Sequence, residues 1–230
     1  MRRPGGRACD AREGRVLSGA GRLASERGVV RVKVCGITRP EDALAAQAAG
    51  ADAVGVILWG RSPRQVDLSV AAAALAPLGP FVQRVGVVVD APEAFVHEAI
   101  TRLRLGAVQF HGHEEPAFMA PFRERVAVIR ALSYTPALDL DRLARLPLDA
   151  LLVDGLRPGS GEAFDWSAAT RLRALGGWVL AGGLTPDNVA AAVRALDPHG
   201  VDVASGVESA PGLKDQAALR RFVAAAKSAR

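Results

Sequence analysis

Two residues that can move protons each follow a short apolar run typical of a buried strand. Cys35 comes after residues 31–34, and Asp154 comes after residues 150–153. An ionised thiol is a base, and a carboxyl group beside apolar side chains keeps its proton closer to neutral pH. A buried structural cysteine and a loop or capping carboxylate are the alternatives, and Asp90 follows another apolar run in the same way. If both strands end at one edge of a sheet, the pair predicts an acid–base site.

Apolar runs and alanine-rich segments alternate along the chain from residue 31 onward. The runs predict parallel strands buried on both faces, at 31–34, 53–58, 82–89, 107–110, 126–131, 150–153, 178–181 and 201–204. Helices are expected at 40–49, 69–75, 92–103, 116–123, 138–146, 167–175, 186–196 and 215–225. Eight strands alternating with eight helices predict an α/β fold of the (β/α)8 barrel type, whose active sites lie at the carboxyl ends of the strands. An open doubly wound sheet is the competing architecture, but the G-x-G-x-x-G first turn is missing.

Proline and glycine mark several of the expected helix ends. Pro40 stands at the start of the first helix, and Gly50 stands where a left-handed residue would end it. Thr185 is expected to cap the helix at 186–196, with Pro186 in its first turn.

The net charge of +5 is concentrated at the N-terminus. Residues 1–30 carry seven arginines against three acids, a net +4, so the rest of the chain is close to neutral. We therefore expect an irregular extension over residues 1–30 and one catalytic domain over 31–230, without a nucleic-acid-binding surface. No apolar run is long enough to cross a membrane, and Cys9 and Cys35 cannot form a disulfide framework, so a cytoplasmic protein is expected.

Charged and histidine side chains follow the second and fourth runs. Arg64, after the second run, could hold a substrate carboxylate with two hydrogen bonds, and Arg61 is an equal candidate on chemistry alone. His111 and His113 form a His-x-His pair that suggests a metal site, but no further ligand completes the set. His111 is therefore expected to face the barrel mouth and to hydrogen-bond the substrate or a neighbouring side chain.

Small residues follow the last two runs and indicate a phosphate site. Gly183 comes after the seventh run, and Ser205 and Gly206 come after the eighth. In this barrel type the backbone N–H groups after strands seven and eight commonly bind phosphate, and glycine lets a ligand approach closely. A sugar phosphate is the substrate class that this pattern predicts.

Motifs in order along the chain carry a family resemblance. They are Lys33-Val34-Cys35-Gly36-Ile37-Thr38 with Glu41-Asp42-Ala43, Ser62-Pro63-Arg64, Val108-Gln109-Phe110-His111-Gly112, Gly159-Ser160-Gly161, Phe164-Asp165-Trp166, Ala181-Gly182-Gly183-Leu184-Thr185-Pro186-Asp187-Asn188-Val189, and Ser205-Gly206-Val207-Glu208 with Pro211-Gly212-Leu213-Lys214-Asp215. Together they resemble the phosphoribosylanthranilate isomerases of tryptophan biosynthesis. The sequence departs from that family's pattern in residues 1–30, at Pro158, where a glycine is common, and at Phe110, where leucine is usual.

The resemblance implies an Amadori rearrangement of N-(5-phosphoribosyl)anthranilate to 1-(2-carboxyphenylamino)-1-deoxyribulose 5-phosphate, without cofactor or metal. It implies that Cys35 is the general base, that Asp154 is the general acid and that Arg64 holds the anthranilate carboxylate. The implied phosphate site is the backbone around Gly183, Ser205 and Gly206. A thiol that serves as the base also predicts a lowered pKa for Cys35, helped by nearby positive charge.

Three other functions are weighed against this one. A barrel isomerase shared with histidine biosynthesis would be expected to carry aspartates at the ends of the first and fifth strands, where this chain has Cys35 and residues 131–133. A phosphate-binding barrel without turnover would be expected to lack Cys35 or Asp154. Nucleic-acid binding through the arginine-rich extension would leave the barrel without a role. The sequence fits a monomer or a homodimer equally well.

Overall fold

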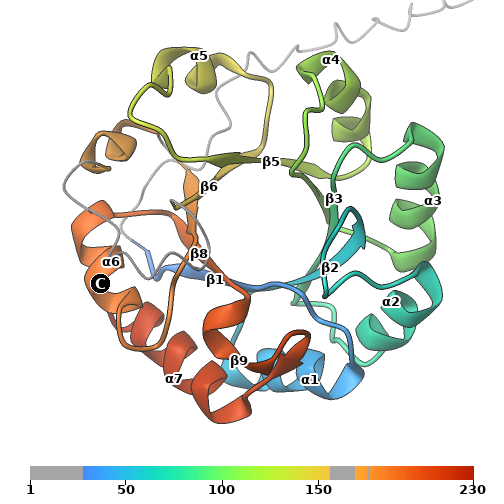
Figure 1. Cartoon of the computed structure of the whole chain (residues 1–230), viewed down its shortest axis with the longest axis horizontal. Coiled ribbons are helices and arrows are strands. Elements are labelled where there is room, and N and C mark those ends of the chain that lie inside the picture. Colours follow the sequence, from blue (N-terminus) through green and yellow to red (C-terminus); the bar gives the residue numbers. More distant parts are fainter. Residues whose placement is uncertain (1–27, 156–168, 176) are drawn as a thin grey trace, which may run out of the picture.

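Eight parallel strands form a closed barrel, each paired with the next and the last with the first. The computed structural model describes residues 28–155, 169–175 and 177–230 of the 230-residue chain. Figure 1 looks into the ring of strands, with the helices arranged outside it. The predicted (β/α)8 architecture is confirmed, and the open doubly wound sheet is excluded because β1 and β8 pair with each other.

The predicted strands lie where the apolar runs indicated. The barrel consists of β1 (Arg31–Val34), β2 (Ala53–Trp59), β3 (Gln83–Val88), β4 (Ala107–Phe110), β5 (Ala127–Ser133), β6 (Ala150–Asp154), β7 (Trp178–Ala181) and β8 (Gly200–Val203). A short hairpin, β9 (Glu208–Ala210) and β10 (Leu213–Lys214), follows β8. The fifth strand runs two residues further than predicted, and the sixth includes Asp154 as its last residue.

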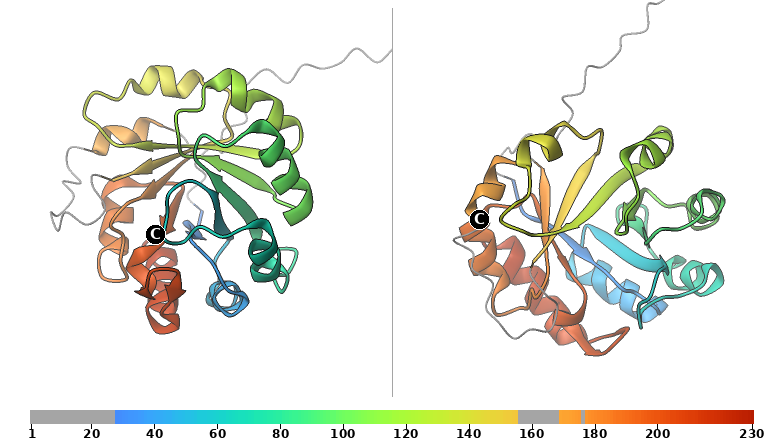
Figure 2. Two further views of the ribbon diagram at one scale, coloured as in Figure 1. Left: turned by 45° about the vertical axis from the view of Figure 1, so that its right-hand side comes forward. Right: turned by 45° about the horizontal axis from the view of Figure 1, so that its top comes forward.

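The helices surround the barrel, as the two turned views in Figure 2 show. The described helices are α1 (Pro40–Ala49), α2 (Leu68–Leu75), α3 (Glu93–Leu103), α4 (Pro116–Met119), α5 (Leu140–Arg145), α6 (Val189–Leu196) and α7 (Gln216–Lys227). As predicted, Pro40 lies in the first turn of α1, and Gly50 ends that helix in the left-handed conformation with φ 91°.

Three helix predictions need correction. Segment 116–123 is a single turn, α4, that tightens into the 3₁₀ helix Ala120–Glu124, where a second proline interrupts the α-helical bonding. Within the described part of segment 167–175, Thr170–Ala174 is also a 3₁₀ helix. Helix α6 begins at Val189, after Asn188, so Thr185 is not its N-cap. Instead the Asn188 side chain accepts a hydrogen bond from the Thr185 N–H at 2.8 Å.

The main core lies between the strands and the helices, where alternate strand residues meet the buried helix faces. Inside the barrel the described side chains divide into two kinds. Strands β5–β7 contribute a small apolar cluster of Ile129, Ala131, Leu152, Val179 and Ala181. Strands β1, β4 and β8 contribute buried polar residues, namely Lys33, Gln109 and Asp202. The barrel interior is therefore polar on one side, and Cys35 continues the inward row that begins at Lys33.

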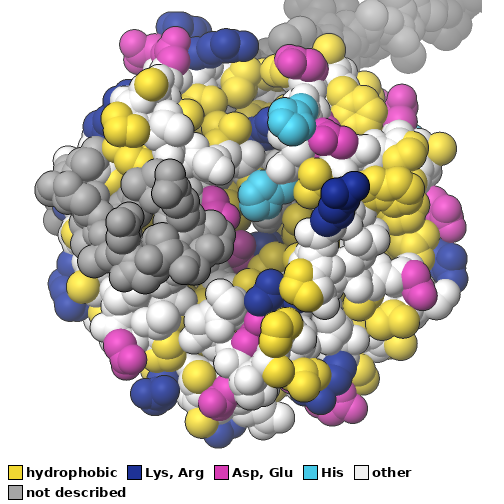
Figure 3. Space-filling view, in the orientation of Figure 1, with side chains coloured by type: hydrophobic (Ala, Val, Ile, Leu, Met, Phe, Trp, Pro, Cys, Tyr) yellow, Lys and Arg dark blue, Asp and Glu magenta, His cyan; other side chains and the backbone are white. Residues whose placement is uncertain are grey.

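In Figure 3 the molecule is hollowed at the centre of the ring, and acidic, basic and histidine side chains gather there. Residues 1–27 and 156–168 lie outside the described residues. This leaves untested the domain boundary at residue 30, Cys9, and the motifs at 158–161 and 164–166. None of the helices in the described part of the chain has the length and apolar character to span a membrane.

Phe122 tests how much the outer core contributes to stability. Its side chain is fully buried and packs against Phe110 and Phe118, with ring centroids 5.5 and 5.7 Å away. We expect Phe122→Ala to lower the free energy of unfolding by about 3–5 kcal/mol, because a large cavity is left. Phe81 is 97 % exposed, so Phe81→Ala should change it by less than about 0.5 kcal/mol. Urea unfolding of both variants gives the comparison, and equal losses would contradict this account of the core.

Candidate active site

Cys35 lies directly after β1 and faces the barrel interior. Its N–H donates to the carbonyl of Val203 at 2.8 Å, which continues the pairing of β1 with β8 beyond the strand end. The residue is only 7 % exposed. A Cβ atom on Gly55 of the neighbouring β2 would stand 3.0 Å from the Cys35 Sγ and 3.2 Å from the Lys33 Nζ. The missing side chain at residue 55 is thus what leaves room for the thiol and the ammonium group together.

Asp154, the last residue of β6, projects toward the same interior. Its Oδ1 is buried and has no hydrogen-bond partner among the described residues. A Cβ atom on Gly182 would lie 2.4 Å from this oxygen, so the glycine after β7 makes the space that the carboxyl group occupies. Burial, with a smaller contribution from the charge of Asp202, raises the pKa of Asp154 to about 6. The carboxyl group can therefore hold a proton close to neutral pH and donate it.

The Cys35 thiol behaves differently from the sequence-based expectation. Burial raises its pKa above the ordinary value, and the positive charge of Lys33 offsets this only in part. The expected lowering of the thiol pKa is thus wrong. The expected positive charge is present, at Lys33 and Lys214, but loss of hydration outweighs it.

Arg64 is fixed beside Cys35 by a bidentate ion pair. Its Nε and Nη2 donate to the two carboxylate oxygens of Glu208 at 2.7–3.0 Å, and the Nζ of Lys214 donates to the same carboxylate at 2.7 Å. The Glu208 side chain is only 4 % exposed. Two cations share one buried anion, so the cluster keeps a net charge of +1 at the mouth. Arg61, the alternative candidate, is an exposed residue of the same loop.

His111 follows β4 and is partly buried, while His113 is exposed on the rim. Burial and the charge of Lys33 lower the pKa of His111, which is therefore neutral near pH 7 and can both donate and accept a hydrogen bond. The backbone N–H of His113 donates to Asp90, and its ring lies 3.1 Å from the same carboxylate. Asp90 therefore contacts His113 on the rim of the barrel. Within the described ranges, no three His, Cys, Asp or Glu residues are grouped so as to hold a metal ion.

The residues predicted to bind phosphate lie on adjacent loops after β7 and β8. Gly183 is exposed, has φ +63°, and has no atom within 4 Å of the place of a Cβ, so space for a ligand is open there. Ser205 and Gly206 begin the 3₁₀ turn Ser205–Val207. A Cβ on Gly206 would stand 1.8 Å from the Leu184 carbonyl, so only glycine lets the two loops touch. The two predicted halves of the phosphate site are therefore side by side.

Comparisons with known proteins identify the family of the chain. Residues 32–225 match the family model described as N-(5'-phosphoribosyl)anthranilate isomerase. The chain belongs to this isomerase family. The isomerase of Geobacter sulfurreducens is 47 % identical over 203 residues, which are 86 % of this chain and 99 % of that protein.

Solved structures of phosphoribosylanthranilate isomerases have the same fold. One, in complex with reduced 1-(o-carboxyphenylamino)-1-deoxyribulose 5-phosphate, is 38 % identical, with a TM-score of 0.78 over 86 % of this chain and 98 % of that one. Another, of monomers generated from the dimeric isomerase of Thermotoga maritima, is 36 % identical, with a TM-score of 0.77 over 86 % and 99 % of the two chains.

Four charged residues around the candidate isomerase site were not singled out from the sequence as site residues, namely Lys33, Asp202, Glu208 and Lys214. All four are buried or partly buried and bear on Cys35, Asp154 or Arg64. A signal was available for two of them. Lys33 and Asp202 are charged residues inside strands that are otherwise continuous apolar runs, a position that needs a partner.

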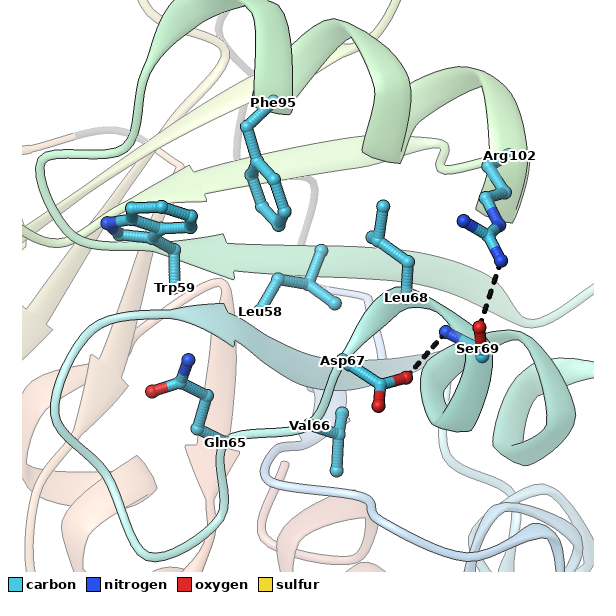
Figure 4. A pocket seen from close by; sticks show the side chains of 9 residues that line it. All are labelled: Leu58, Trp59, Gln65, Val66, Asp67, Leu68, Ser69, Phe95 and Arg102. Atoms are coloured by element: carbon cyan, nitrogen blue, oxygen red, sulfur yellow. Dashed lines mark hydrogen bonds between the residues drawn. The ribbon is translucent and has the colours of Figure 1, made fainter.

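Figure 4 shows a separate pocket on the outside of this isomerase-family barrel, between α2 and α3. Trp59 and Phe95 form its aromatic wall, with ring centroids 4.8 Å apart. Three of its polar side chains are already paired, because Asp67 caps α2 by accepting from the Ser69 N–H, and Arg102 donates to the Ser69 hydroxyl. The pocket is set apart from Cys35 and Asp154, which do not line it.

A stability measurement tests the unusual ionisation of Asp154. Its folded-state pKa is about 6 against an ordinary 3.8, so folding favours the protonated form, and stability is lost as the pH rises through this interval. Asp154→Asn removes that penalty. We expect the variant to match the parent near pH 3.5 and to be more stable by roughly 3 kcal/mol above pH 7. Urea unfolding at several pH values measures this difference, and a pH-independent difference would contradict the raised pKa.

Proposed function

We propose that this chain catalyses the isomerisation of N-(5'-phosphoribosyl)anthranilate to 1-(2-carboxyphenylamino)-1-deoxyribulose 5-phosphate, a step of tryptophan biosynthesis. The observation that carries the proposal is the partly buried Asp154 carboxyl group, whose pKa is about 6 and whose Oδ1 has no hydrogen-bond partner among the described residues, in a barrel interior that also holds Cys35. Membership of the isomerase family gives the substrate. In this proposal Asp154 is the general acid and Cys35 is the general base.

The first step opens the sugar ring. Protonated Asp154 donates its proton to the furanose ring oxygen while the C1–O bond breaks, and the nitrogen lone pair forms a C=N bond to C1. The product is an open-chain protonated Schiff base with a hydroxyl group at C4. An acid with a pKa of about 6 is suited to this step because it is still partly protonated near neutral pH and is stronger than water.

The second step removes the proton from C2. The positively charged imine withdraws electrons and makes this proton acidic, and the Cys35 thiolate takes it to give an enolamine. The enolamine then tautomerises to the ketone by proton movement alone. No electrons leave or enter the substrate, so this sequence balances without a redox cofactor.

The charged cluster at the mouth is suited to the aromatic carboxylate. Glu208 occupies the Nε and Nη2 side of the Arg64 guanidinium, so the plane of the group is fixed while the Nη1 side is left for substrate. Neighbouring Lys214 brings the cluster to a net positive charge, which favours an anion. Arg64 would hold the carboxylate and set the orientation of the substrate against Cys35.

The phosphate end of the substrate has candidate partners on the loops after β7 and β8. The loops at Gly183 and at Ser205–Gly206 would bind the phosphate through backbone N–H groups, which supply donors without adding bulk. Neutral His111 would hydrogen-bond the substrate or a neighbouring side chain.

The proposal extends to the setting of the enzyme. A catalytic thiol must stay reduced, which supports a cytoplasmic location. A monomer and a homodimer both remain compatible with the site, since the residues named here come from one chain.

Single substitutions test the two proton-transfer roles. Loss of substrate fluorescence on mixing with freshly generated phosphoribosylanthranilate measures turnover. We expect Cys35→Ala and Asp154→Ala each to reduce kcat by at least about 100-fold, since a positioned acid or base contributes 10²–10⁴-fold.

Asp90→Asn is the matched control. Asp90 also follows a strand, but it contacts the rim histidine His113, so the parent rate should be kept. A folded parent without turnover would overturn the proposed function. A parent with turnover and an active Cys35→Ala variant would overturn the role of the thiol alone.

A conservative change tests the carboxylate-binding role of Arg64. Lysine keeps the charge but cannot make the bidentate contact with Glu208, so its ammonium group is no longer fixed. We expect Arg64→Lys to raise KM at least about tenfold and to change kcat less, with steady-state kinetics as the measurement. An unchanged KM with a reduced kcat would contradict substrate binding by Arg64.

A further inference from the structure

We propose that Lys33 and Asp202 are positioning residues for both proton transfers, in which Lys33 holds the thiolate form of Cys35 while Asp202 keeps Lys33 charged and keeps the proton on Asp154. The inference rests on the proposed function and adds to it two residues that do not themselves react. Its basis is an ion pair inside the barrel.

The ion pair lies inside the barrel beside Cys35, and Asp202 is close enough to Asp154 for its charge to act on that carboxyl group. The Lys33 Nζ lies 2.9 Å from the Asp202 Oδ1, and both side chains are at most 10 % exposed. Lys33 and Cys35 are two residues apart, so their side chains point into the barrel from the same side of the chain. Both reach the gap left by Gly55, where the Cys35 Sγ and the Lys33 Nζ lie 3.0 and 3.2 Å from the place of a Cβ.

Charges reach the thiol from every side of this gap. Lys33 from β1 acts by charge and by a hydrogen bond, Lys214 from β10 acts by charge, and both favour the thiolate of Cys35. Asp202 from β8 opposes it, by less than Lys33 favours it. Arg64, in the loop after β2, also lies within range of the thiolate. Lys33 favours the thiolate in two ways, by its charge and by a hydrogen bond to the sulfur, whereas Lys214 acts on it by charge.

Asp202 acts on both partners of the reaction. Burial disfavours the charge on Lys33, yet Asp202 and Cys35 together raise its pKa above the ordinary value, so it stays charged inside the barrel. On Asp154, burial has the largest effect, and the charge of Asp202 adds to it. His111, which follows β4, is also within range of this pair: Lys33 and Arg130 lower its pKa, and Asp202 and Glu114 raise it.

The ion pair is needed because the reaction uses an improbable combination of ionisation states. The acid must be protonated and the thiol ionised at the same time, although Asp154 has a pKa of about 6 and Cys35 one above its ordinary value. Each unit between the two pKa values reduces the fraction of molecules that have both forms about tenfold, so this fraction is small. Lys33 narrows this difference by favouring the thiolate of Cys35, and Asp202 contributes by keeping Lys33 charged and by raising the pKa of Asp154.

Direct titration of the thiol tests the role of Lys33 without any substrate. In a Cys9→Ser background, the absorbance of the thiolate near 240 nm reports Cys35 alone. We expect Lys33→Met to reduce the ionised fraction of Cys35 at pH 8 by about tenfold or more. The double variant Lys33→Met/Asp202→Asn leaves no unpaired buried charge. It should also reduce the ionised fraction of Cys35, but by less, because Asp202, which opposes the thiolate, is removed as well. An unchanged titration in the folded variants would overturn the inference.

The pH profile of kcat/KM then tests both residues. The parent should give a bell with limbs set by Asp154 and Cys35. With Lys33→Met only the thiol limb should move, to higher pH, so the bell becomes wider and its plateau falls about tenfold. With Asp202→Asn the Asp154 limb should move to lower pH, because that carboxyl group loses its negative neighbour. A purely structural role would lower the plateau without moving either limb, and that result would overturn the inference.

Arg31→Met is the matched control. Arg31 lies two residues before Lys33 on β1 and pairs with Asp52 at 2.8 Å, at the end of the barrel away from Cys35. The thiol titration and the pH profile should be those of the parent, and an equal effect would overturn the assignment to Lys33. If the parent has no turnover on phosphoribosylanthranilate, the proposed function fails, whereas the thiol titration still decides whether Lys33 holds the thiolate.

Discussion

Exclusion of water from the barrel interior is the physical constraint on which the rest of the site depends. Closing eight strands into a ring places alternate side chains in a space too narrow for bulk solvent. In that space a carboxyl group keeps its proton to a higher pH, and a thiol also loses its proton only at a higher pH, because burial raises the pKa of both Asp154 and Cys35. The first effect suits an acid, and the second opposes a base. The buried charges beside Cys35 are arranged around that conflict.

The charged groups at the barrel mouth have a net positive charge, whereas those in the barrel interior form a neutral pair. At the mouth, Glu208 pairs with both Arg64 and Lys214, and the surplus positive charge remains close to solvent, where an anion can reach it. In the interior, Lys33 and Asp202 are equal and opposite, so the barrel holds two charges without a net charge. An unpaired charge at that depth would strongly destabilise the fold. A neutral pair instead gives a local field that differs in sign at its two ends.

The sequence predicts the fold well because the apolar runs are long and regular, and strands such as Trp178–Ala181 lie where they were expected. Short helices such as Pro116–Met119 were less predictable, since a proline one turn later decides where the α-helix stops. The positions of Cys35, Asp154 and Arg64 follow from strand ends and the family pattern. The ionisation of Cys35 does not, because it depends on burial and on Asp202, which is 167 residues away in the chain.

Much of the site is shaped by side chains that are missing. Gly55 leaves the gap for the thiol and the ammonium group, Gly182 leaves the gap for the Asp154 carboxyl group, and Gly206 lets two loops touch. None of these glycines takes part in a reaction, yet Gly182 and Gly206 stand against backbone atoms that cannot move far, and Gly55 stands against the thiol and ammonium groups themselves. The positions of the Cys35 and Asp154 side chains therefore depend on these glycines being kept during evolution. Positions without chemistry would be as intolerant of change as those with it, and new substrates would be reached by varying the rim instead.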